Sequence, residues 1–346
     1  LCTGCSRCVP ACPVGIDIPW INTVVRDRRN RSADHRLEWL VDGLSPDAEP
    51  AGAPLQRRFF GTFETVARWG SATAPVSNWL AALAPTRRLM AWLLGIDPRR
   101  ALPQFARQTF VDWAADHHSS VDTPLRRAVV YPDLYTNHVQ VARGRAAVRA
   151  LEALGVDVVV PAVASSGRAP LSQGMVTTAT DHAERVHAAL APHIADGRDV
   201  VVIEPSDHAM FQHEYARLLD APAAESLASH SYELCEYIYG LFEHGADPAA
   251  LTDGAATPLA YHSHCQQRTL DLEAHTVAVL ERCGFDVETT AVECCGMAGS
   301  FGYKRDYYEV SMDVGGRLAD QLRADGLAGR AVVASGTSCL EQIDAL

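Results

Sequence analysis

Short apolar runs alternate with longer amphipathic stretches from Arg126 onward, and this order occurs twice. The runs predict strands, because they are four or five residues long and most of them are rich in Val or Ala. The predicted strands are Ala128–Tyr131, Val156–Val160 and Asp199–Ile203 in the first copy, then Pro258–Tyr261, Phe285–Thr289 and Ala331–Ala334 in the second.

The two copies also share their spacing. Gly155 precedes Ser165 by ten residues, and Gly284 precedes Cys294 by the same ten. An internal repeat governs the fold prediction. Because each copy alternates strand and helix, the sequence predicts an α/β protein with two small Rossmann-like parallel-sheet units. We expect the first repeat over residues 126–220, a helical connector over 221–255 with a helix around Tyr232–Phe242, and the second repeat over 256–346.

The residues before the repeats predict helices and a linker. Asp17 and Pro19 have the positions of a helix cap and an early helical proline. Ser45–Pro54 is rich in Pro, Ala and acidic residues, which predicts a linker. Residues 36–125 are expected to be a helical spacer, with short apolar helices from Arg57 to Trp113 broken at prolines. Its tryptophans predict core or interdomain packing, with a membrane- or partner-docking surface as the alternative; they are Trp69, Trp79, Trp92 and Trp113.

Composition and charge narrow the function. The chain has 346 residues, is 48% hydrophobic and carries a net charge of −12, which argues against nucleic acid as the main partner. The ten cysteines are few and clustered, so metal ligation in a reducing compartment is favoured over a disulfide scaffold. No apolar run has the length of a membrane span. Since the chain begins at Leu1, directly on a cysteine motif, we expect a fragment with further sequence upstream.

The first cysteine motif lies at the amino end. Cys2, Cys5, Cys8 and Cys12, followed by Pro13, have the spacing C-x2-C-x2-C-x3-C-P. Three thiolates so close together can surround one face of an iron–sulfur cube, and the fourth commonly binds a neighbouring cluster in two-cluster ferredoxins. Residues 1–35 therefore predict a ferredoxin-type [4Fe–4S] segment, the second half of a two-cluster domain, in which Cys12 completes this cluster or binds another with upstream cysteines. A zinc knuckle is the alternative.

The second motif is dispersed along the second repeat. Cysteines follow each of its predicted strands, at Cys265, Cys294, Cys295 and Cys339. The carboxyl ends of parallel strands share one sheet edge, so we expect these thiols to meet and bind a metal centre. Gly296, Gly299 and Gly302 would let backbone amides approach the sulfur atoms.

The first repeat lacks these thiols. The corresponding positions hold Tyr135, Ser165, Ser166 and Asp207. Ser and Asp are hard oxygen ligands with low affinity for cluster iron, so no cluster is expected there.

The stretch Glu293–Tyr303, with the sequence ECCGMAGSFGY, resembles the cysteine-rich CCG domain of iron–sulfur proteins. Those proteins include subunits of glycolate oxidase and anaerobic glycerol-3-phosphate dehydrogenase, lactate-utilisation proteins, heterodisulfide reductase and the C-terminal half of FAD-linked 2-hydroxyacid dehydrogenases. The order of ferredoxin motif, spacer and two repeats is similar along nearly the whole chain. One departure is Gly336, which stands where the family has the first cysteine of a C-x-x-C pair.

The resemblance implies an electron-transfer component of an oxidoreductase acting on a 2-hydroxyacid or glycerol-3-phosphate. It implies [4Fe–4S] clusters at both cysteine motifs, FAD on a missing segment or a flavin-containing or lactate-utilisation-type partner, and a quinone-type acceptor. A cytoplasmic location is expected, with possible contact to the inner face of the cell membrane. The alternatives are a catalytic cluster of the heterodisulfide reductase type, which Gly336 disfavours, and a zinc-stapled docking module.

Further residues near the motifs are secondary candidates. His262 and His264 flank Cys265 and could hydrogen-bond a cluster sulfide or assist proton movement. Cys235 and Cys283 lie in helical patterns and are expected to be buried free thiols. No Gly-rich phosphate loop stands in a strand–helix setting, so no nucleotide or flavin site is expected in this chain.

Overall fold

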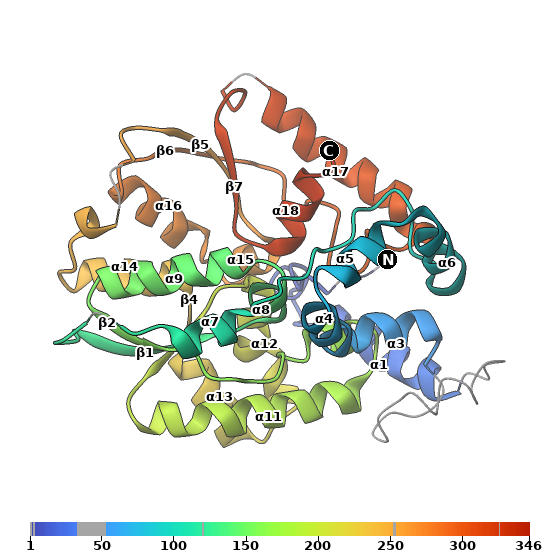
Figure 1. Cartoon of the computed structure of the whole chain (residues 1–346), viewed down its shortest axis with the longest axis horizontal. Helices are drawn as coiled ribbons and strands as arrows, with labels where there is room; N and C mark the ends of the chain where they lie inside the picture. Colours follow the sequence, from blue (N-terminus) through green and yellow to red (C-terminus); the bar gives the residue numbers. More distant parts are fainter. Residues whose placement is uncertain (1, 3, 33–52, 120, 252–253, 325) are drawn as a thin grey trace.

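The computed structural model describes residues 2, 4–32, 53–119, 121–251, 254–324 and 326–346, and has an α/β fold with two parallel sheets (Figure 1). The first sheet has the order β2-β1-β3-β4, and its strands are β1 (Arg126–Tyr131), β2 (Val156–Val159), β3 (Asp199–Val202) and β4 (Ser231–Glu233). The second has the order β6-β5-β7, with β5 (Pro258–His262), β6 (Asp286–Thr289) and β7 (Ala331–Ala334). Every pairing is parallel. The α/β prediction is confirmed, and each predicted strand is present.

One element of the connector differs from the prediction. The predicted helix around Tyr232–Phe242 begins later, as α14 (Leu234–Glu243), and β4 precedes it. The Glu233 carboxylate accepts the backbone N–H groups of Cys235 and Glu236, which fixes the start of the helix. The residues before it pair with β3 instead. A long-range pairing therefore decides a boundary that the helical pattern alone places too early.

Helices connect and cover the strands. Those of the first repeat are α8 (Leu134–His138), α9 (Val141–Ala153), α10 (Arg168–Ser172), α11 (Val176–Ala195) and α12 (Pro205–Gln212), followed by α13 (Ala221–His230). Those of the second are α15 (Cys265–Thr269), α16 (Glu273–Arg282), α17 (Tyr308–Arg323) and α18 (Thr337–Ile343).

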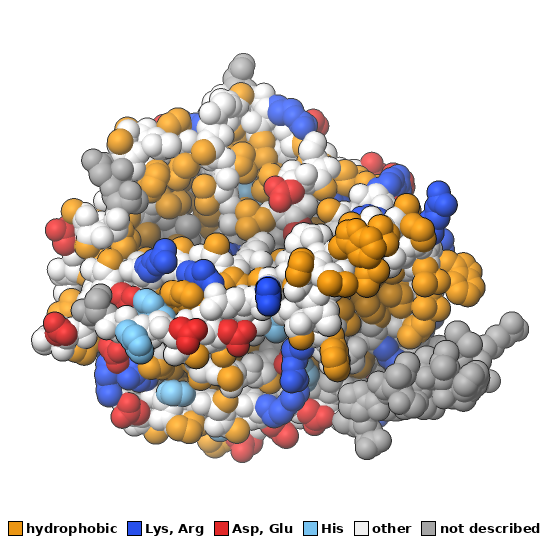
Figure 2. Space-filling model, viewed as in Figure 1, with side chains coloured by type: hydrophobic (Ala, Val, Ile, Leu, Met, Phe, Trp, Pro, Cys, Tyr) orange, Lys and Arg blue, Asp and Glu red, His pale blue; other side chains and the backbone are white. Residues whose placement is uncertain are grey.

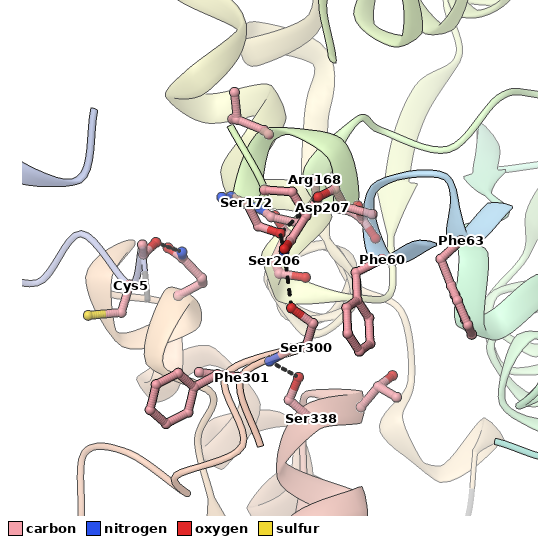
Figure 3. Close-up of a pocket in the computed structure, with 18 of the residues that line it drawn as sticks. Cys5, Phe60, Phe63, Arg168, Ser172, Ser206, Asp207, Ser300, Phe301 and Ser338 are labelled. Atoms are coloured by element: carbon pink, nitrogen blue, oxygen red, sulfur yellow. Dashed lines mark hydrogen bonds between the residues drawn. The ribbon is translucent and has the colours of Figure 1, made fainter. Parts of the chain in front are cut away.

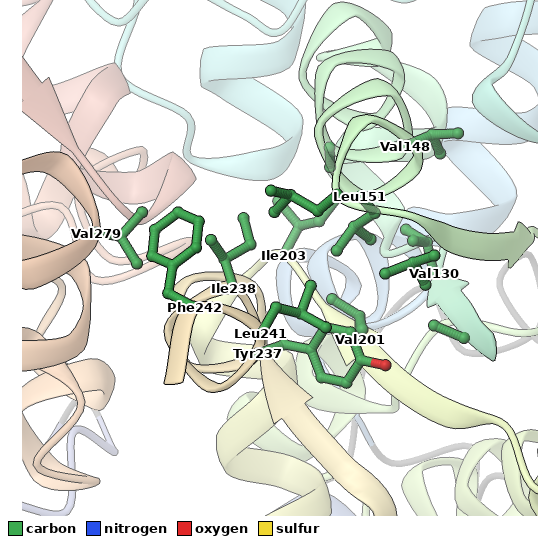
Figure 4. Packing of buried hydrophobic residues seen from close by; sticks show 14 of the residues in the cluster. Val130, Val148, Leu151, Val201, Ile203, Tyr237, Ile238, Leu241, Phe242 and Val279 are labelled. Carbon is green, nitrogen blue, oxygen red and sulfur yellow. The ribbon is translucent and has the colours of Figure 1, made fainter. Parts of the chain in front are cut away.

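The two repeats share one apolar core (Figure 4). Val130 and Val201 of the first sheet pack with Leu151 of α9 and Ile238 of α14, and the same cluster reaches Val279 of α16 in the second repeat. Burial of apolar side chains across this contact stabilises the two units against each other. The cysteine-bearing edge of the second sheet is thereby held in a fixed place relative to the first repeat.

The amino-terminal segment and spacer pack against both repeats (Figure 1). Helix α1 (Ile18–Ser32) begins as predicted, because Asp17 Oδ1 accepts the N–H of Trp20 at 2.9 Å. The spacer contains α3 (Leu55–Gly61), α4 (Phe63–Ala72), α5 (Val76–Ala82), α6 (Ala84–Leu94) and α7 (Phe110–Asp116). Most of the predicted linker, residues 45–52, lies outside the described residues. No described helix has both the length and the apolar character needed to cross a bilayer.

The packing predicted for the tryptophans is wrong for three of them. Trp69, Trp79 and Trp92 are 68%, 62% and 79% exposed, whereas Trp113 packs against the shared core. On α5, polar side chains occupy the inward positions that its apolar residues are expected to take.

Candidate functional site

The amino-terminal cysteine segment lies on α15 of the second repeat. Thr269 Oγ1 donates to the carbonyl of Cys5 at 2.9 Å, and Gln266 Nε2 donates to the carbonyl of Gly4 at 2.7 Å. Arg7 adds a bond to the carbonyl of Arg268 at 3.2 Å. Hydrogen bonds thus join residues more than 250 positions apart in the chain, and they place the first cysteine motif beside the second.

The thiols within the first motif differ in surroundings. Cys2 and Cys5 line a cavity, while Cys8 is exposed. Partial desolvation, and then the nearby Cys5 and Cys2, raise the pKa of Cys8. Cys12 Sγ accepts the backbone N–H of Ile16 at 3.4 Å, and this bond and others from the same turn lower its pKa. Amides aimed at a sulfur stabilise its thiolate, which is the form that binds iron.

The dispersed cysteines of the second repeat meet at the carboxyl edge of its sheet. Cys265 opens α15 after β5, Cys294 and Cys295 lie in the loop after β6, and Cys339 lies in α18 after β7. Cys295 and Cys339 are both buried, and each affects the pKa of the other: Cys339 lowers that of Cys295, and Cys295 raises that of Cys339. Burial raises the pKa of Cys265, and the nearby thiols of Cys294, Cys5 and Cys295 raise it further. The four cysteines thus follow neighbouring strands of one sheet and line the same cavity.

Backbone amides surround the sulfur atoms of the loop after β6. The Gly296 N–H points to Cys294 Sγ at 3.4 Å. Cys339 and the N–H groups of Met297 and Ala298 lower the pKa of Cys295. Gly296 has a φ of +90°, and a Cβ there would lie 2.3 Å from the carbonyl oxygen of Ser311. Glycine is strongly favoured at this position, because a Cβ would meet both the left-handed backbone and the Ser311 carbonyl.

One cavity of about 1080 Å³ is lined by residues of both motifs. Its thiol wall comes from both ends of the chain, and its other walls come from the spacer and the first repeat. Cys5 lies on one side in Figure 3, and Phe60 and Phe63 of the spacer lie on the other. The thiols that line it are Cys2, Cys5, Cys265, Cys294, Cys295 and Cys339. No group of three or more His, Cys, Asp or Glu side chains in the described ranges has the geometry of a site for a single metal ion.

The two histidines beside Cys265 have different surroundings. His264 lines the cavity, and its Nδ1 accepts the N–H of Gln266 at 3.2 Å. His262 is buried, and its Nδ1 is hydrogen-bonded to Thr290 Oγ1 at 2.7 Å. It does not line the cavity, and burial lowers its pKa to about 3. The His264 ring also occupies the space beside Gly336, where a Cβ would lie 2.3 Å from it. The space beside Gly336 is thus filled by an imidazole from the loop after β5.

The cysteine-free positions of the first repeat bond to one another. The Ser166 hydroxyl donates to Asp207, and burial, followed by Asp133, raises the pKa of Asp207 to about 8. The Ser165 hydroxyl donates to Glu64 at 2.8 Å. Tyr135 lines the cavity with them. This wall presents hydroxyl and carboxyl groups in the places where the second repeat presents thiols.

Two polar residues of the site have no signal in the local sequence. Glu204 of the first repeat accepts the N–H and the hydroxyl of Thr337, both at 2.9 Å, and so holds the start of the helix that carries Cys339. Lys304 lines the cavity, and burial, followed by Arg57 and Arg26, lowers its pKa to about 8. The sequence places Lys304 only near a helix start, because its charged neighbours come from α1 and α3, which no local pattern connects to it.

Comparisons with known proteins give distant relatives. No protein-family model matches the chain. One subunit of the anaerobic glycerol-3-phosphate dehydrogenase of Escherichia coli (strain K12) is 23% identical over 284 residues, which are 78% of this chain and 68% of that protein. D-2-hydroxyglutarate dehydrogenases of Escherichia coli (strain K12) and Pantoea ananatis (strain AJ13355) are each 22% identical, over 99% of this chain and 32% of their own length. The chain thus spans about a third of those two dehydrogenases. These likenesses support an oxidoreductase role and make the chain a distant relative of dehydrogenases and their subunits.

Proposed function

We propose that the chain is an iron–sulfur electron-transfer component of an oxidoreductase that oxidises a 2-hydroxyacid, such as lactate or glycolate, or glycerol-3-phosphate. The observation that carries the proposal is the single cavity lined by thiols of both cysteine motifs. The names of the relatives support the substrate classes, since one is a glycerol-3-phosphate dehydrogenase subunit and the others oxidise a 2-hydroxyacid.

The residues fit iron–sulfur clusters in donor type and surroundings. Thiolates are the usual protein ligands of these clusters, and amide hydrogen bonds to sulfur tune their reduction potentials. In this proposal Cys2, Cys5 and Cys8 hold one cluster, and Cys12 completes it or binds a further one. A second set holds another, namely Cys265, Cys294, Cys295 and Cys339. Bound [4Fe–4S] clusters would supply one-electron chemistry at both places.

The chain's own contribution is to hold the two sites at a fixed separation. The bonds from Thr269 and Gln266 to the first motif attach it directly to the helix that begins with Cys265. Glu204 fixes the helix that bears Cys339 in the same way. In the proposed assembly, FAD on another segment or on a flavin-containing partner donates electrons and a quinone-type compound accepts them. The proposed location is the cytoplasm, at the inner face of the cell membrane.

The packing at Gly336 bears on the catalytic alternative. Because the His264 ring fills the space beside Gly336, a fifth thiolate ligand has no place there in the present arrangement. This supports an ordinary four-ligand cluster in the second repeat over the five-cysteine centre associated with heterodisulfide reductases.

Anaerobic reconstitution with iron and sulfide tests the proposal. We expect the full chain to bind iron and acid-labile sulfide and to give a paramagnetic spectrum on reduction. Cys294→Ser should lower the bound iron, because it removes one thiolate ligand. Cys235→Ser is the matched control, since this thiol lies on α14, away from the cavity.

Replacement of Ser165 and Ser166 by Ala should also leave the iron content unchanged. Colourless protein without iron would contradict the proposal, and zinc without acid-labile sulfide would favour the docking module instead.

A further inference from the structure

Helix α5 has its polar and apolar sides reversed relative to an ordinary surface helix. Its polar side chains point inward: Asn78 Nδ2 donates to the carbonyl of Phe105 at 2.9 Å, and Ser77 Oγ donates to the carbonyl of Gly70 at 2.7 Å. Its large apolar side chains are exposed, and none of its residues is buried. A helix on a water-exposed surface normally has the opposite arrangement.

The neighbouring helices extend the same apolar surface. Trp69 of α4 and Trp92 of α6 are the most exposed large apolar side chains in the part of the spacer that the structure describes. In Figure 2 apolar side chains gather over the part of the molecule that Figure 1 labels α5 and α6. We name this surface the α4–α6 face, and its exposed apolar members are Trp69, Val76, Trp79, Leu80, Leu89, Trp92 and Leu93. An apolar surface of this kind marks an interaction site.

The charge of this region is opposite to that of the whole chain. Residues 65–96 contain no Asp or Glu and three arginines, Arg68, Arg87 and Arg88, although the whole chain carries −12. Arg68 and Arg88 are exposed; Arg68 precedes Trp69 in the chain, and Arg88 stands four residues before Trp92 on α6. Exposed Trp and Arg side chains are together typical of surfaces that bind the lipid headgroup layer. The amphipathic indole ring is stable at this interface, and the guanidinium is attracted to anionic headgroups.

The cavity continues beneath the same helices. Phe63 and Val66 of α4, Ala81 of α5 and Met90 of α6 line it, and it extends from them to the thiols. The apolar end of the cavity therefore lies under the exposed face, on the side from which a membrane-dissolved acceptor would come.

We propose that the α4–α6 face docks on the surface of an anionic lipid bilayer, with the three tryptophans inserted at headgroup level. A second copy of the chain is a poorer occupant, because a symmetric pair would place Arg68 and Arg88 of each copy against a surface of the same charge. The α4–α6 face would supply the surface for the membrane contact of the proposed function. The docking itself requires neither cluster nor substrate.

Flotation of the full chain with lipid vesicles tests the docking. We expect binding to vesicles of phosphatidylcholine mixed with phosphatidylglycerol, weaker binding to phosphatidylcholine alone, and weakening by salt. Trp79→Ser combined with Trp92→Ser should reduce binding about tenfold or more, because two large apolar groups are lost. Since both side chains are exposed, this variant should fold as the parent does.

Matched controls separate the face from general surface effects. Leu125→Ser with Val310→Ser changes two exposed apolar residues outside the spacer helices, and it should bind as the parent does. Arg88→Glu should weaken binding to anionic vesicles, whereas Arg149→Glu, an exposed charge on α9, should not.

Three outcomes would overturn the docking proposal. They are no flotation with anionic vesicles, parent-like flotation of the double tryptophan variant, or a tryptophan-dependent dimer that binds no vesicle. Because the flotation uses protein without added iron, failure of docking is distinguishable from failure of the iron–sulfur proposal, which the iron and sulfide content decides.

Discussion

At the residue scale, the cysteine loop after β6 turns on two glycines that differ in their surroundings. Gly296 and Gly299 both have positive φ, at +90° and +59°. A Cβ at Gly296 would collide with the backbone of Ser311, whereas a Cβ at Gly299 would meet nothing within 4 Å. A side chain at Gly299 would therefore cost stability only through the left-handed backbone, whereas one at Gly296 would also cost stability through a collision.

We predict that Gly299→Ala lowers the free energy of unfolding by about 1–2 kcal/mol, the cost of a left-handed backbone with a Cβ. Gly296→Ala should lower it by roughly 1–3 kcal/mol more, because the packed neighbours must move. Urea denaturation of both variants measures the difference. Equal losses would show that the backbone near Ser311 yields without cost.

A second residue-scale prediction concerns pH. Burial, and next the nearby Asp133, raise the pKa of Asp207 to about 8, above the ordinary value of about 4. The folded state therefore retains a proton that the unfolded chain releases, and the free energy of unfolding should fall as pH rises from about 4 to about 8. Burial of Glu233, with a pKa of about 7, acts in the same direction.

Asp207→Asn removes one of these titrations while keeping an acceptor for the Ser166 hydroxyl. We expect the free energy of unfolding of this variant to fall less than that of the parent between about pH 4 and about pH 8. The difference between the two falls should be on the order of 1–3 kcal/mol. Asp306→Asn, at an exposed position, should follow the parent. Denaturation midpoints across the pH range give the comparison, and parallel curves for the parent and Asp207→Asn would refute the assignment.

At the element scale, the spacer is anchored to the cysteine loop through Arg100. Its Nε donates to the carbonyl of Gly302 and its Nη2 to Ser311 Oγ, both at 2.8 Å, and the residue is buried. Ile96 bridges to Lys304 beside it. The helices of the α4–α6 face and the loop after β6 therefore share one attachment.

We predict that Arg100→Ala lowers the free energy of unfolding by about 2–4 kcal/mol, because two bonds from a charged donor are lost and buried acceptors are left unpaired. Arg305→Ala, at a nearby exposed position, should change it by less than about 0.5 kcal/mol. Urea denaturation followed by circular dichroism checks both. A small effect of Arg100→Ala would mean that water replaces the guanidinium.

Local sequence patterns predict some of these elements and contacts but not others. The strands and the edge that gathers Cys265 and Cys339 follow from local pattern and from the geometry of parallel sheets. The outward direction of Trp79 does not follow from local pattern. It results from the inward direction of Asn78, which donates to the carbonyl of Phe105, 27 residues away. The filling of the Gly336 space by His264 does not follow from local pattern either, since those two residues are adjacent only in the folded chain.

At the scale of the whole molecule, the proposed function depends on contact between the two ends of the chain. The amino-terminal motif is attached to α15 by side chains from α15 itself, including Thr269 to the carbonyl of Cys5 and Gln266 to that of Gly4. Electron exchange falls steeply with distance, so these bonds should set the rate between the two proposed clusters.

We therefore predict that Thr269→Val combined with Gln266→Leu leaves both sets of cysteines able to bind iron but loosens the first motif from the second. Iron content should be unchanged, while magnetic interaction between the reduced centres weakens and electron transfer between them slows. Thr73→Val, which loses a bond to the carbonyl of Trp69 at the end of α4, is the control and should match the parent.

Paramagnetic resonance of the reduced protein and rapid-mixing kinetics give the two measurements. If the double variant keeps the parent's spectrum and rate, the attachment on α15 does not set the separation. The remaining contacts of the amino-terminal segment, such as Arg26 to the carbonyl of Cys2 at 2.5 Å, would then have to hold it in place.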